Sequence, residues 1–169
     1  MKRIKRGDVF SFEVEKLGFG FCQVIECNII QYINVFENIL PHSDPKGLGE
    51  LGRRVLIGWT SDARIYHGYW KFQFNAPVPE GMIYHKFIEN INGLKYLTDY
   101  NGKIIHLANQ YDLEKYDLNF SYSPITYEKA LAALHSGEWE ERFDRIMVAN
   151  IEAASRSNPT EWLRNAPRH

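Results

Sequence analysis

Alternating apolar and polar residues predict a strand over residues 8–14. Phe10, Phe12 and Val14 alternate with polar neighbours, and this period of two places the apolar side chains on one face of a strand. An aromatic and β-branched run over residues 19–26 follows after a short turn and predicts a second strand. We therefore expect the two runs to form an antiparallel hairpin. Gly20 stands between two phenylalanines in the second strand, where a missing side chain marks a bulge or a close backbone approach.

Three further runs extend the predicted sheet. Residues 29–36 are apolar on both faces, which is typical of a strand inside a small sheet or barrel. Residues 53–59 and 70–74 also read as strands, and Pro77 then interrupts the sheet.

Two Asn-Gly pairs predict a three-stranded meander. Asn92-Gly93 and Asn101-Gly102 each stand between apolar or alternating runs, and Asn-Gly is the strongest short hairpin signal. The meander is expected over residues 83–91, 94–99 and 103–108.

After residue 123 the apolar period becomes helical. A first helix is predicted from a cap at Thr126 to Gly137. The apolar stripe of a second helix consists of Trp139, Phe143, Ile146, Met147, Asn150 and Ile151. Asn158-Pro159 predicts a short third helix around Trp162. The fold class expected is α+β: a mainly antiparallel β sheet or partly open barrel with C-terminal helices packed on it.

Length and composition are those of one globular domain. The chain has 169 residues, of which 44% are hydrophobic and 24% charged, and this composition excludes disorder, collagen and coiled coil. We expect a single domain over residues 1–169, β-rich over 5–110 and helical over 124–165. Cys22 and Cys27 fall five apart on a predicted strand, point to opposite faces and are expected to be reduced core residues.

The N-terminal segment is basic. Its cations are Lys2, Arg3, Lys5 and Arg6. Cations beside Phe10 and Phe12 permit a nucleic-acid interpretation, since cations contact phosphate and aromatic rings stack on bases. The alternation buries those rings, however, and the net charge is −1, so nucleic acid is not the partner we expect. Gly7-Asp8 ends the basic run without an apolar stretch, and no 18-residue apolar run exists, so we expect a cytoplasmic protein without membrane contact.

A Gly-x-Gly-x-x-Gly motif stands at Gly47, Gly49 and Gly52. A dinucleotide fingerprint needs a strand before it, a helix after it and an acidic residue about 20 positions on. Here a turn-rich loop precedes the motif, the strand-like run 53–59 follows it, and Phe72 stands near the ribose position. We interpret the motif as a surface loop.

The sequence contains no catalytic or metal-binding signature. It lacks a Gly-x-Ser-x-Gly elbow, a His-Glu-x-x-His motif, a Cys-x-x-Cys motif and a phosphate loop. The six histidines include no pair at metal-ligand spacing; His85 and His106 fall on different predicted strands. We therefore predict no catalytic residue, no cofactor and no metal.

The stretch from Gly58 to Trp70 is the most unusual in the chain. Its candidate binding residues are Trp59, Asp62, Arg64, Tyr66, Tyr69 and Trp70. Trp, Tyr and Arg dominate protein–protein hot spots because they combine a large area with a polar group. Trp59 and Trp70 also fit the core at strand ends, which leaves Asp62, Arg64 and Tyr66 as the better candidates for exposure. The loop over residues 41–53 adds the acidic candidates Asp44 and Glu50.

Several of these segments together resemble the immunity protein 26 family of bacterial polymorphic toxin systems. They are Lys5-Arg-Gly-Asp-Val-Phe10, Gly18-Phe-Gly-Phe-Cys-Gln-Val-Ile25, the strand ending in Trp59, and Gly68-Tyr-Trp70. The likeness is strongest over residues 5–25 and weaker through about residue 110. It implies a small, mainly β, intracellular protein that binds a cognate toxin and blocks it, and it implies no catalytic residues.

Three functions follow from this sequence. The first is stoichiometric inhibition, in which a rigid β scaffold presents loops that occlude the active site of a toxin over about 800 Å² per partner. The second is a small hydrolase, because some relatives of the family are described as phosphotriesterases, although no His-x-His pair is present for a binuclear metal site. The third is a nucleic-acid-binding barrel, which predicts exposed aromatic residues on a strand face.

Overall fold

The computed structural model describes residues 3–156. These residues form two compact units, one of residues 3–81 and 121–148 and the other of residues 82–120 and 149–156. Each unit is described by itself below. The organisation of the chain as a single domain stays a prediction.

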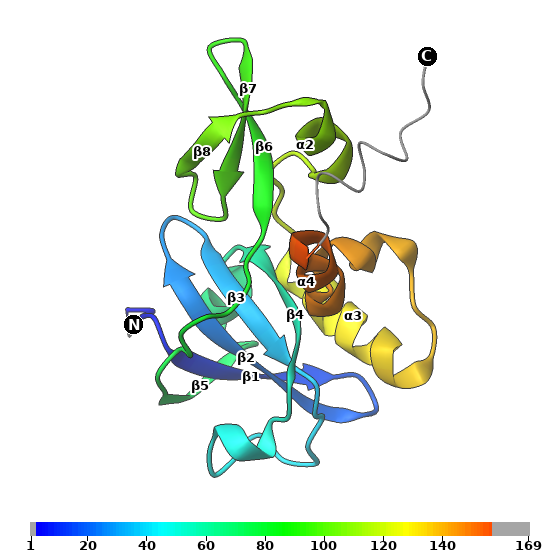
Figure 1. Ribbon diagram of the computed structural model, residues 1–169. Coiled ribbons are helices and arrows are strands. Elements are labelled where there is room, and N and C mark those ends of the chain that lie inside the picture. The colour runs from blue at the N-terminus through cyan, green and yellow to red at the C-terminus, as the bar shows by residue number, and fades with distance from the viewer. Residues whose placement is uncertain (1–2, 157–169) are drawn as a thin grey trace. The chain divides into compact units, whose positions relative to one another are not determined.

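A five-stranded antiparallel sheet forms the centre of the first unit (Figure 1). Its strands are β1 (Asp8–Val14), β2 (Gly18–Cys27), β3 (Gln31–Phe36), β4 (Arg54–Thr60) and β5 (Lys71–Asn75). The order across the sheet is β4-β3-β2-β1-β5, so the first four strands follow one another and β5 returns to pair with β1. All five predicted strands of this region are present, within three residues of their expected limits.

The central strands of this sheet are buried on both faces. Every residue of β3 is buried, as its apolar sequence predicted, whereas Ile29 lies in the preceding turn and is 96% exposed. In β1 only Glu13 is exposed. Ser11 is buried rather than solvent-facing, and its hydroxyl accepts a hydrogen bond from Gln73 Nε2 at 2.7 Å. The alternation in β1 therefore separates apolar from polar residues, but residues on both faces of the strand are buried.

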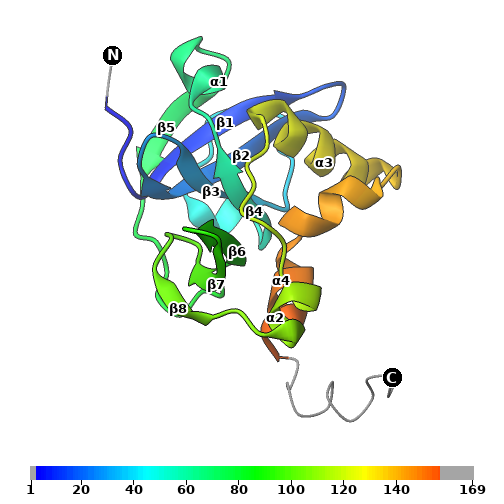
Figure 2. The ribbon, with the colours of Figure 1, turned by 90° about the horizontal axis from the view of Figure 1, so that it is seen from above.

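Helix α3 (Pro124–Ser136) packs against the sheet (Figure 2). It contacts β1 and β4, which two other strands separate in the sheet, so the helix lies across the sheet rather than along one strand. The helix begins at the N-cap Ser123, three residues before the predicted cap Thr126, because Pro124 occupies its first turn. It ends at Gly137, as predicted, in the left-handed conformation at φ 78°.

Two glycines in the strands allow α3 to approach closely. A Cβ on Gly20 of β2 would lie 2.6 Å from the side chains of Leu131 in the helix and Phe12 in β1, so the space at Gly20 is taken by side chains rather than by the bulge or close backbone approach that the sequence predicted. A Cβ on Gly58 of β4 would clash with the Tyr127 hydroxyl. That hydroxyl donates a buried hydrogen bond to the Trp59 carbonyl at 2.9 Å. The glycines therefore fix the distance between helix and sheet.

The predicted continuous helix over residues 139–151 is wrong. The structure has a 3-10 helix, η2 (Glu141–Ile146), followed after a break by helix α4 (Val148–Arg156). Met147 adopts extended backbone geometry and forms a bridge with Leu56 of β4. The Met147 N–H still bonds the Asp144 carbonyl at 3.3 Å, but the extended backbone at Met147 interrupts the helical ladder. Phe143 and Ile146 are nevertheless fully buried, as the apolar stripe predicted.

Two short helical segments complete the first unit. The 3-10 helix η1 (Leu48–Glu50) lies in the Gly-x-Gly-x-x-Gly segment, which belongs to the loop between β3 and β4. Helix α1 (Ala63–Tyr66) lies between β4 and β5. The glycine motif thus follows no dinucleotide-binding geometry, as its sequence context predicted.

The second unit contains the predicted meander. Its strands β6 (Lys86–Ile91), β7 (Leu94–Asp99) and β8 (Ile104–Leu107) form an antiparallel sheet in that order. Asn92 and Gly93 both have positive φ, as the Asn-Gly hairpin signal requires. Helix α2 (Gln110–Lys115) follows, and the sequence analysis did not predict it.

The α+β fold class is confirmed, with open antiparallel sheets and C-terminal helices. The predicted short helix around Trp162 lies outside the described residues. Among residues 3–156, none of the helices combines the length and apolar character needed to cross a membrane.

Replacing Gly58 with alanine should lower the free energy of unfolding by about 1–3 kcal/mol, because the added methyl group displaces Tyr127 from its hydrogen bond to Trp59. Urea denaturation measures this loss. Gly49→Ala is the control, since no atom lies within 4 Å of a Cβ at Gly49. Equal stability of the two variants would show that the approach of α3 at Gly58 is not tight.

Candidate binding surface

The segment from Asp62 to Trp70 forms a compact loop between β4 and β5. Helix α1 occupies its first half, and the chain then reverses at Gly68, which has φ 75°. The Arg64 carbonyl accepts hydrogen bonds from the backbone N–H groups of both Tyr69 and Trp70, at 2.8 and 3.0 Å. These bonds close the loop, so its side chains project from a defined backbone.

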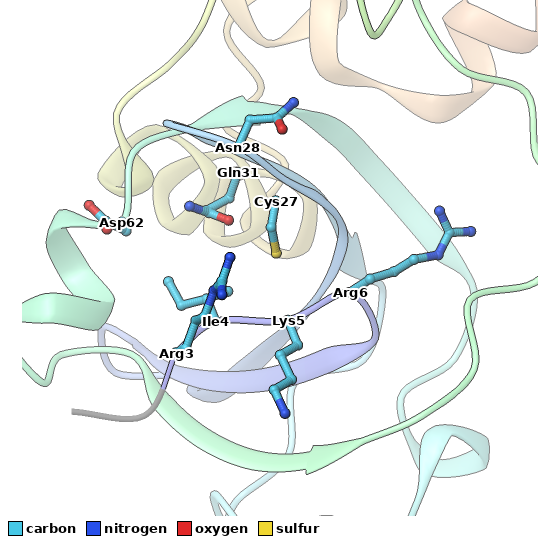
Figure 3. A pocket seen from close by; sticks show the side chains of 8 residues that line it. All are labelled: Arg3, Ile4, Lys5, Arg6, Cys27, Asn28, Gln31 and Asp62. Carbon is cyan, nitrogen blue, oxygen red and sulfur yellow. The ribbon is translucent and has the colours of Figure 1, made fainter.

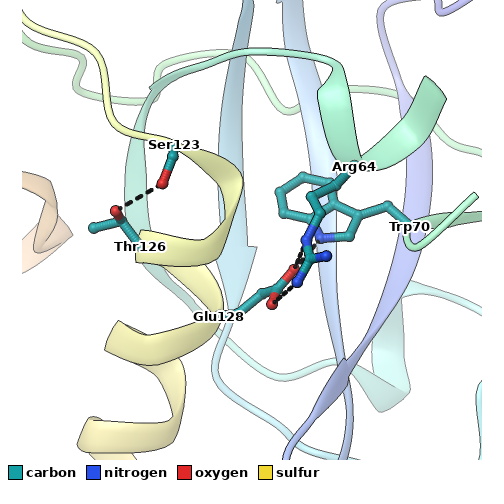
Figure 4. Close-up of polar contacts among 5 residues, drawn as sticks. All are labelled: Arg64, Trp70, Ser123, Thr126 and Glu128. Atoms are coloured by element: carbon teal, nitrogen blue, oxygen red, sulfur yellow. Dashed lines mark hydrogen bonds and ion pairs between the residues drawn. The ribbon is translucent and has the colours of Figure 1, made fainter. Parts of the chain in front are cut away.

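A polar cluster of Arg64, Trp70 and Glu128 attaches this loop to α3 (Figure 4). The Arg64 guanidinium donates two hydrogen bonds to the Glu128 carboxylate, at 3.1 and 3.0 Å. The Trp70 indole N–H donates a third to the same carboxylate, at 2.7 Å. The side chains of Arg64 and Glu128 are only 26% and 15% exposed, so water screens the pair incompletely. Glu128 therefore holds both ends of the loop.

The two tryptophans of the stretch belong to the core. Trp59 is 5% exposed and lies edge-on to Tyr32, with ring centroids 5.0 Å apart. Trp70 is 2% exposed and stacks on Phe12 at 5.2 Å. Arg64 is half-buried in its ion pair rather than exposed. None of the three presents a free side chain to a partner.

Tyr66 and Tyr69 are the exposed aromatic residues of the loop. They are 62% and 61% exposed, respectively. The Arg64 guanidinium lies 4.4 Å from the centroid of the Tyr69 ring, which restricts the ring's motion. Tyr66 has an edge-on contact with His67. The loop thus offers two aromatic rings to solvent, one of them fixed by the same arginine that anchors the loop.

A cleft of about 440 Å³ adjoins Tyr69. It lies between the loop, the end of β1 and helix α3. Its lining residues are Glu13, Val14, Glu15, Arg64, Tyr69, Ile125, Glu128, Lys129 and Ala132. Ile125 is partly exposed and supplies an apolar contact, while Glu13 and Glu15 at the end of β1 add negative charge and Lys129 of α3 adds a positive charge. We call Tyr66, Tyr69 and this cleft the tyrosine surface.

The remaining predicted residues lie elsewhere. Asp62 lines a different cavity, together with the N-terminal segment. Asp44 and Glu50 lie in the loop before β4, whereas the tyrosines follow β4, so the seven residues of that strand separate the two sites by roughly 20 Å. The Asp44 carboxylate is 3.2 Å from His42, and the Glu50 carboxylate accepts a hydrogen bond from the Lys46 backbone. The structure does not join these acids to the tyrosine surface.

The cysteines provide no activated nucleophile. Burial raises the pKa of the Cys22 thiol well above its usual range. Burial, together with the charges of Glu26 and Asp8, raises the pKa of Cys27 as well. Both thiols are therefore protonated at neutral pH, and a protonated thiol is a weak nucleophile.

Two histidines, His85 and His106, lie in the second unit and contact neighbouring side chains there. His85 is buried and stacks on Phe87, with ring centroids 5.1 Å apart. His106 contacts the Asp112 carboxylate at 2.8 Å, and Asp112 also caps α2. Within residues 3–156, no group of three or more His, Cys, Asp or Glu side chains is arranged to hold a metal ion.

Sequence reasoning missed Glu128. Glu128 carried no signal because its partner Arg64 is 64 residues away.

Comparisons of the chain with protein-family models, curated proteins and solved structures returned no match.

Proposed function

We propose that this protein is an immunity protein that binds a cognate bacterial toxin in the cytoplasm and occludes its active site, without chemistry of its own. The resemblance of residues 5–25 to the immunity protein 26 family supports the class of partner. The observation that carries the proposal is the pair of exposed tyrosines, Tyr66 and Tyr69, on a loop that Glu128 holds in place.

The physical argument concerns the cost of binding. Tyrosine contributes a large contact area and a hydroxyl while losing little conformational entropy, and is therefore enriched at binding hot spots. A loop that must become ordered on binding loses affinity, whereas one already fixed does not. Arg64 and Trp70 fix this loop to α3, and Arg64 also restrains the Tyr69 ring. The tyrosine surface is thus arranged before a partner arrives.

The adjoining cleft supports the same proposal. Its volume of about 440 Å³ accommodates a side chain of a partner beside Tyr69, with Ile125 as an apolar contact. Glu13 and Glu15 outnumber Lys129 among the lining residues outside the Arg64–Glu128 pair, so the cleft favours a basic side chain of the toxin. A partner anchored here would cover the loop, the cleft and the end of α3 together.

Replacing Tyr66 or Tyr69 with alanine should weaken toxin binding by about thirtyfold each, because loss of an anchoring aromatic side chain typically costs about 2 kcal/mol. Both side chains are more than half exposed, so each variant should melt like the parent. Rescue of cells that express the cognate toxin, together with titration calorimetry of the purified pair, measures the effect.

Ile29→Ala is the matched control, since Ile29 is the most exposed large apolar side chain among the described residues and lies in the turn between β2 and β3. Asp44→Ala and Glu50→Ala test the loop before β4. If the Tyr66→Ala/Tyr69→Ala double variant protects cells fully and binds with parental affinity, the tyrosine surface is not the interface. Loss of protection only in the Asp44 or Glu50 variants would move the interface to their loop.

A further inference from the structure

A second cavity lies in the first unit, where the N-terminal segment passes the turn between β2 and β3. Its volume is about 540 Å³, within the range of small-molecule sites. The lining residues are Arg3, Ile4, Lys5, Arg6, Cys27, Asn28, Gln31 and Asp62 (Figure 3). It shares no lining residue with the tyrosine surface.

Gln31 is the most unusual group in this cavity. The residue is 4% exposed, and its Oε1 atom is buried without a hydrogen-bond partner within the described part of the chain. Thr60 pairs with Gln31 across the sheet, and its buried Oγ1 atom also lacks a partner there. An unpaired buried polar atom is unfavourable because it has lost its hydrogen bonds to water and gained none in the protein. A ligand that donates a hydrogen bond to Gln31 would remove this cost.

The cations of the cavity are not equivalent. Figure 3 shows the Arg3 side chain directed toward the middle of the cavity and toward Gln31, while the side chains of Lys5 and Arg6 point away from it. Asp62 lies at the margin and adds a negative charge. The interior therefore presents one guanidinium and one amide, with one carboxylate at the edge.

We infer that this cavity binds a small ligand with a carboxylate next to an N–H donor, the chemistry shared by a free α-amino acid and by the C-terminal residue of a peptide. The planar guanidinium of Arg3 matches a carboxylate with two parallel hydrogen bonds. The neighbouring N–H donates to Gln31 Oε1. Asp62 provides a counter-charge for the ammonium group, which only the free amino acid carries on the same carbon as its carboxylate.

Other ligand classes fit these residues less well. A phosphate dianion carries two negative charges but would meet only one inward cation, and Asp62 would repel it more strongly than a singly charged carboxylate. A nucleotide base would find no aromatic ring among the lining residues on which to stack. A simple cation would be repelled by Arg3. A carboxylate with an adjacent donor uses both inward-facing groups.

Titration calorimetry with the full-length protein tests the inference with four probes: L-alanine, trialanine, trialanine with an amidated C-terminus, and inorganic phosphate. L-alanine, trialanine or both should bind, and the amidated peptide and phosphate should bind at least tenfold more weakly. Asp62→Asn should weaken L-alanine and leave trialanine unchanged, which distinguishes the two sources. Absence of binding by both carboxylate probes, or equal binding of phosphate, would overturn the inference.

Variants of the two inward groups complete the test. Arg3→Gln should weaken the binding carboxylate probe at least tenfold, whereas Lys5→Gln, whose side chain points away, should not. Gln31→Met should also abolish binding without lowering the midpoint of thermal unfolding, because the amide oxygen has no bond to lose. Parental affinity in Arg3→Gln would overturn the inference even if Gln31→Met failed to fold.

Cys27 offers an independent measurement within the cavity. Its thiol is partly accessible, whereas Cys22, the other cysteine of the chain, is fully buried. A bound carboxylate probe should slow alkylation of Cys27 by iodoacetamide at least severalfold, and the amidated peptide should not. Equal alkylation rates with and without a saturating carboxylate probe would show that the ligand binds elsewhere.

Discussion

Replacing Phe143 with alanine should lower the free energy of unfolding by about 3–5 kcal/mol, the usual cost of deleting a buried aromatic side chain. Phe143 is completely buried in η2, with the Trp139 ring edge-on at 5.3 Å. Segment η2 contacts β4, so the cavity left by the substitution would open between them. A domain of this size has about 5–15 kcal/mol of stability, so the variant loses a large part of it.

Urea denaturation followed by tryptophan fluorescence measures this loss. Phe72→Ala is a control of the same residue type, since Phe72 is 39% exposed at the edge strand β5 and its removal leaves a smaller cavity. We expect a clearly smaller effect for the control. A loss below about 1 kcal/mol in Phe143→Ala would mean that the region around η2 repacks and that Phe143 is not part of a rigid core.

The strands could be predicted from the sequence because their signals are local. The alternation in residues 8–14 and the two Asn-Gly turns depend on neighbours in the chain, and the structure has β1 and the three-stranded meander at those positions. Gly20 indicated a crowded position, but the atoms that crowd it belong to the side chains of Leu131 and Phe12 rather than to a backbone, and Leu131 is more than 100 residues away. Local patterns thus determined the elements but not their partners.

The prediction of one continuous helix over residues 139–151 was wrong because a tertiary contact overrides the local pattern there. The apolar stripe through Phe143 and Ile146 is real, and both residues are buried. The pattern nevertheless continues through Met147, where the backbone pairs with Leu56 of β4 and ends the 3-10 helix. The periodicity of residues 139–151 contains no information about β4, which lies about 90 residues earlier in the chain. An apolar stripe therefore predicts which side chains are buried better than it predicts an unbroken helix.

The candidate site could likewise be predicted only where its features are local in the sequence. Tyr66 and Tyr69 could be identified from the sequence as candidates by residue type, and Tyr66 is exposed as expected, whereas the exposure of Tyr69 was not predicted. The role of Arg64 could not, because its ion pair with Glu128 exists only in the folded chain. The cavity around Gln31 had no signal at all, since a buried unpaired amide is a property of packing.

Replacing Glu128 with alanine should lower the free energy of unfolding by about 3 kcal/mol, because it removes the shared acceptor of three hydrogen bonds. The Trp70 indole N–H would stay buried without a partner, and Arg64 would lose its counter-charge. The Asp62–Trp70 loop would also lose its attachment to α3. Toxin binding should therefore weaken in Glu128→Ala although Tyr66 and Tyr69 are both retained.

A double-mutant cycle with Arg64→Ala separates the ion pair from other effects of Glu128. If the pair acts as described, Glu128→Ala and the double variant should differ by less than Arg64→Ala alone costs, with a coupling of about 1–3 kcal/mol in urea denaturation. The same cycle in toxin titrations reports on the loop and the cleft together, since both single variants leave the tyrosines in place but change residues that line the cleft. Strictly additive losses in stability would mean that the 3.0 Å contact contributes nothing on its own. Undiminished toxin binding in Glu128→Ala would mean that an ordered loop is not required, because the tyrosines would then bind from a flexible segment as well as from a fixed one.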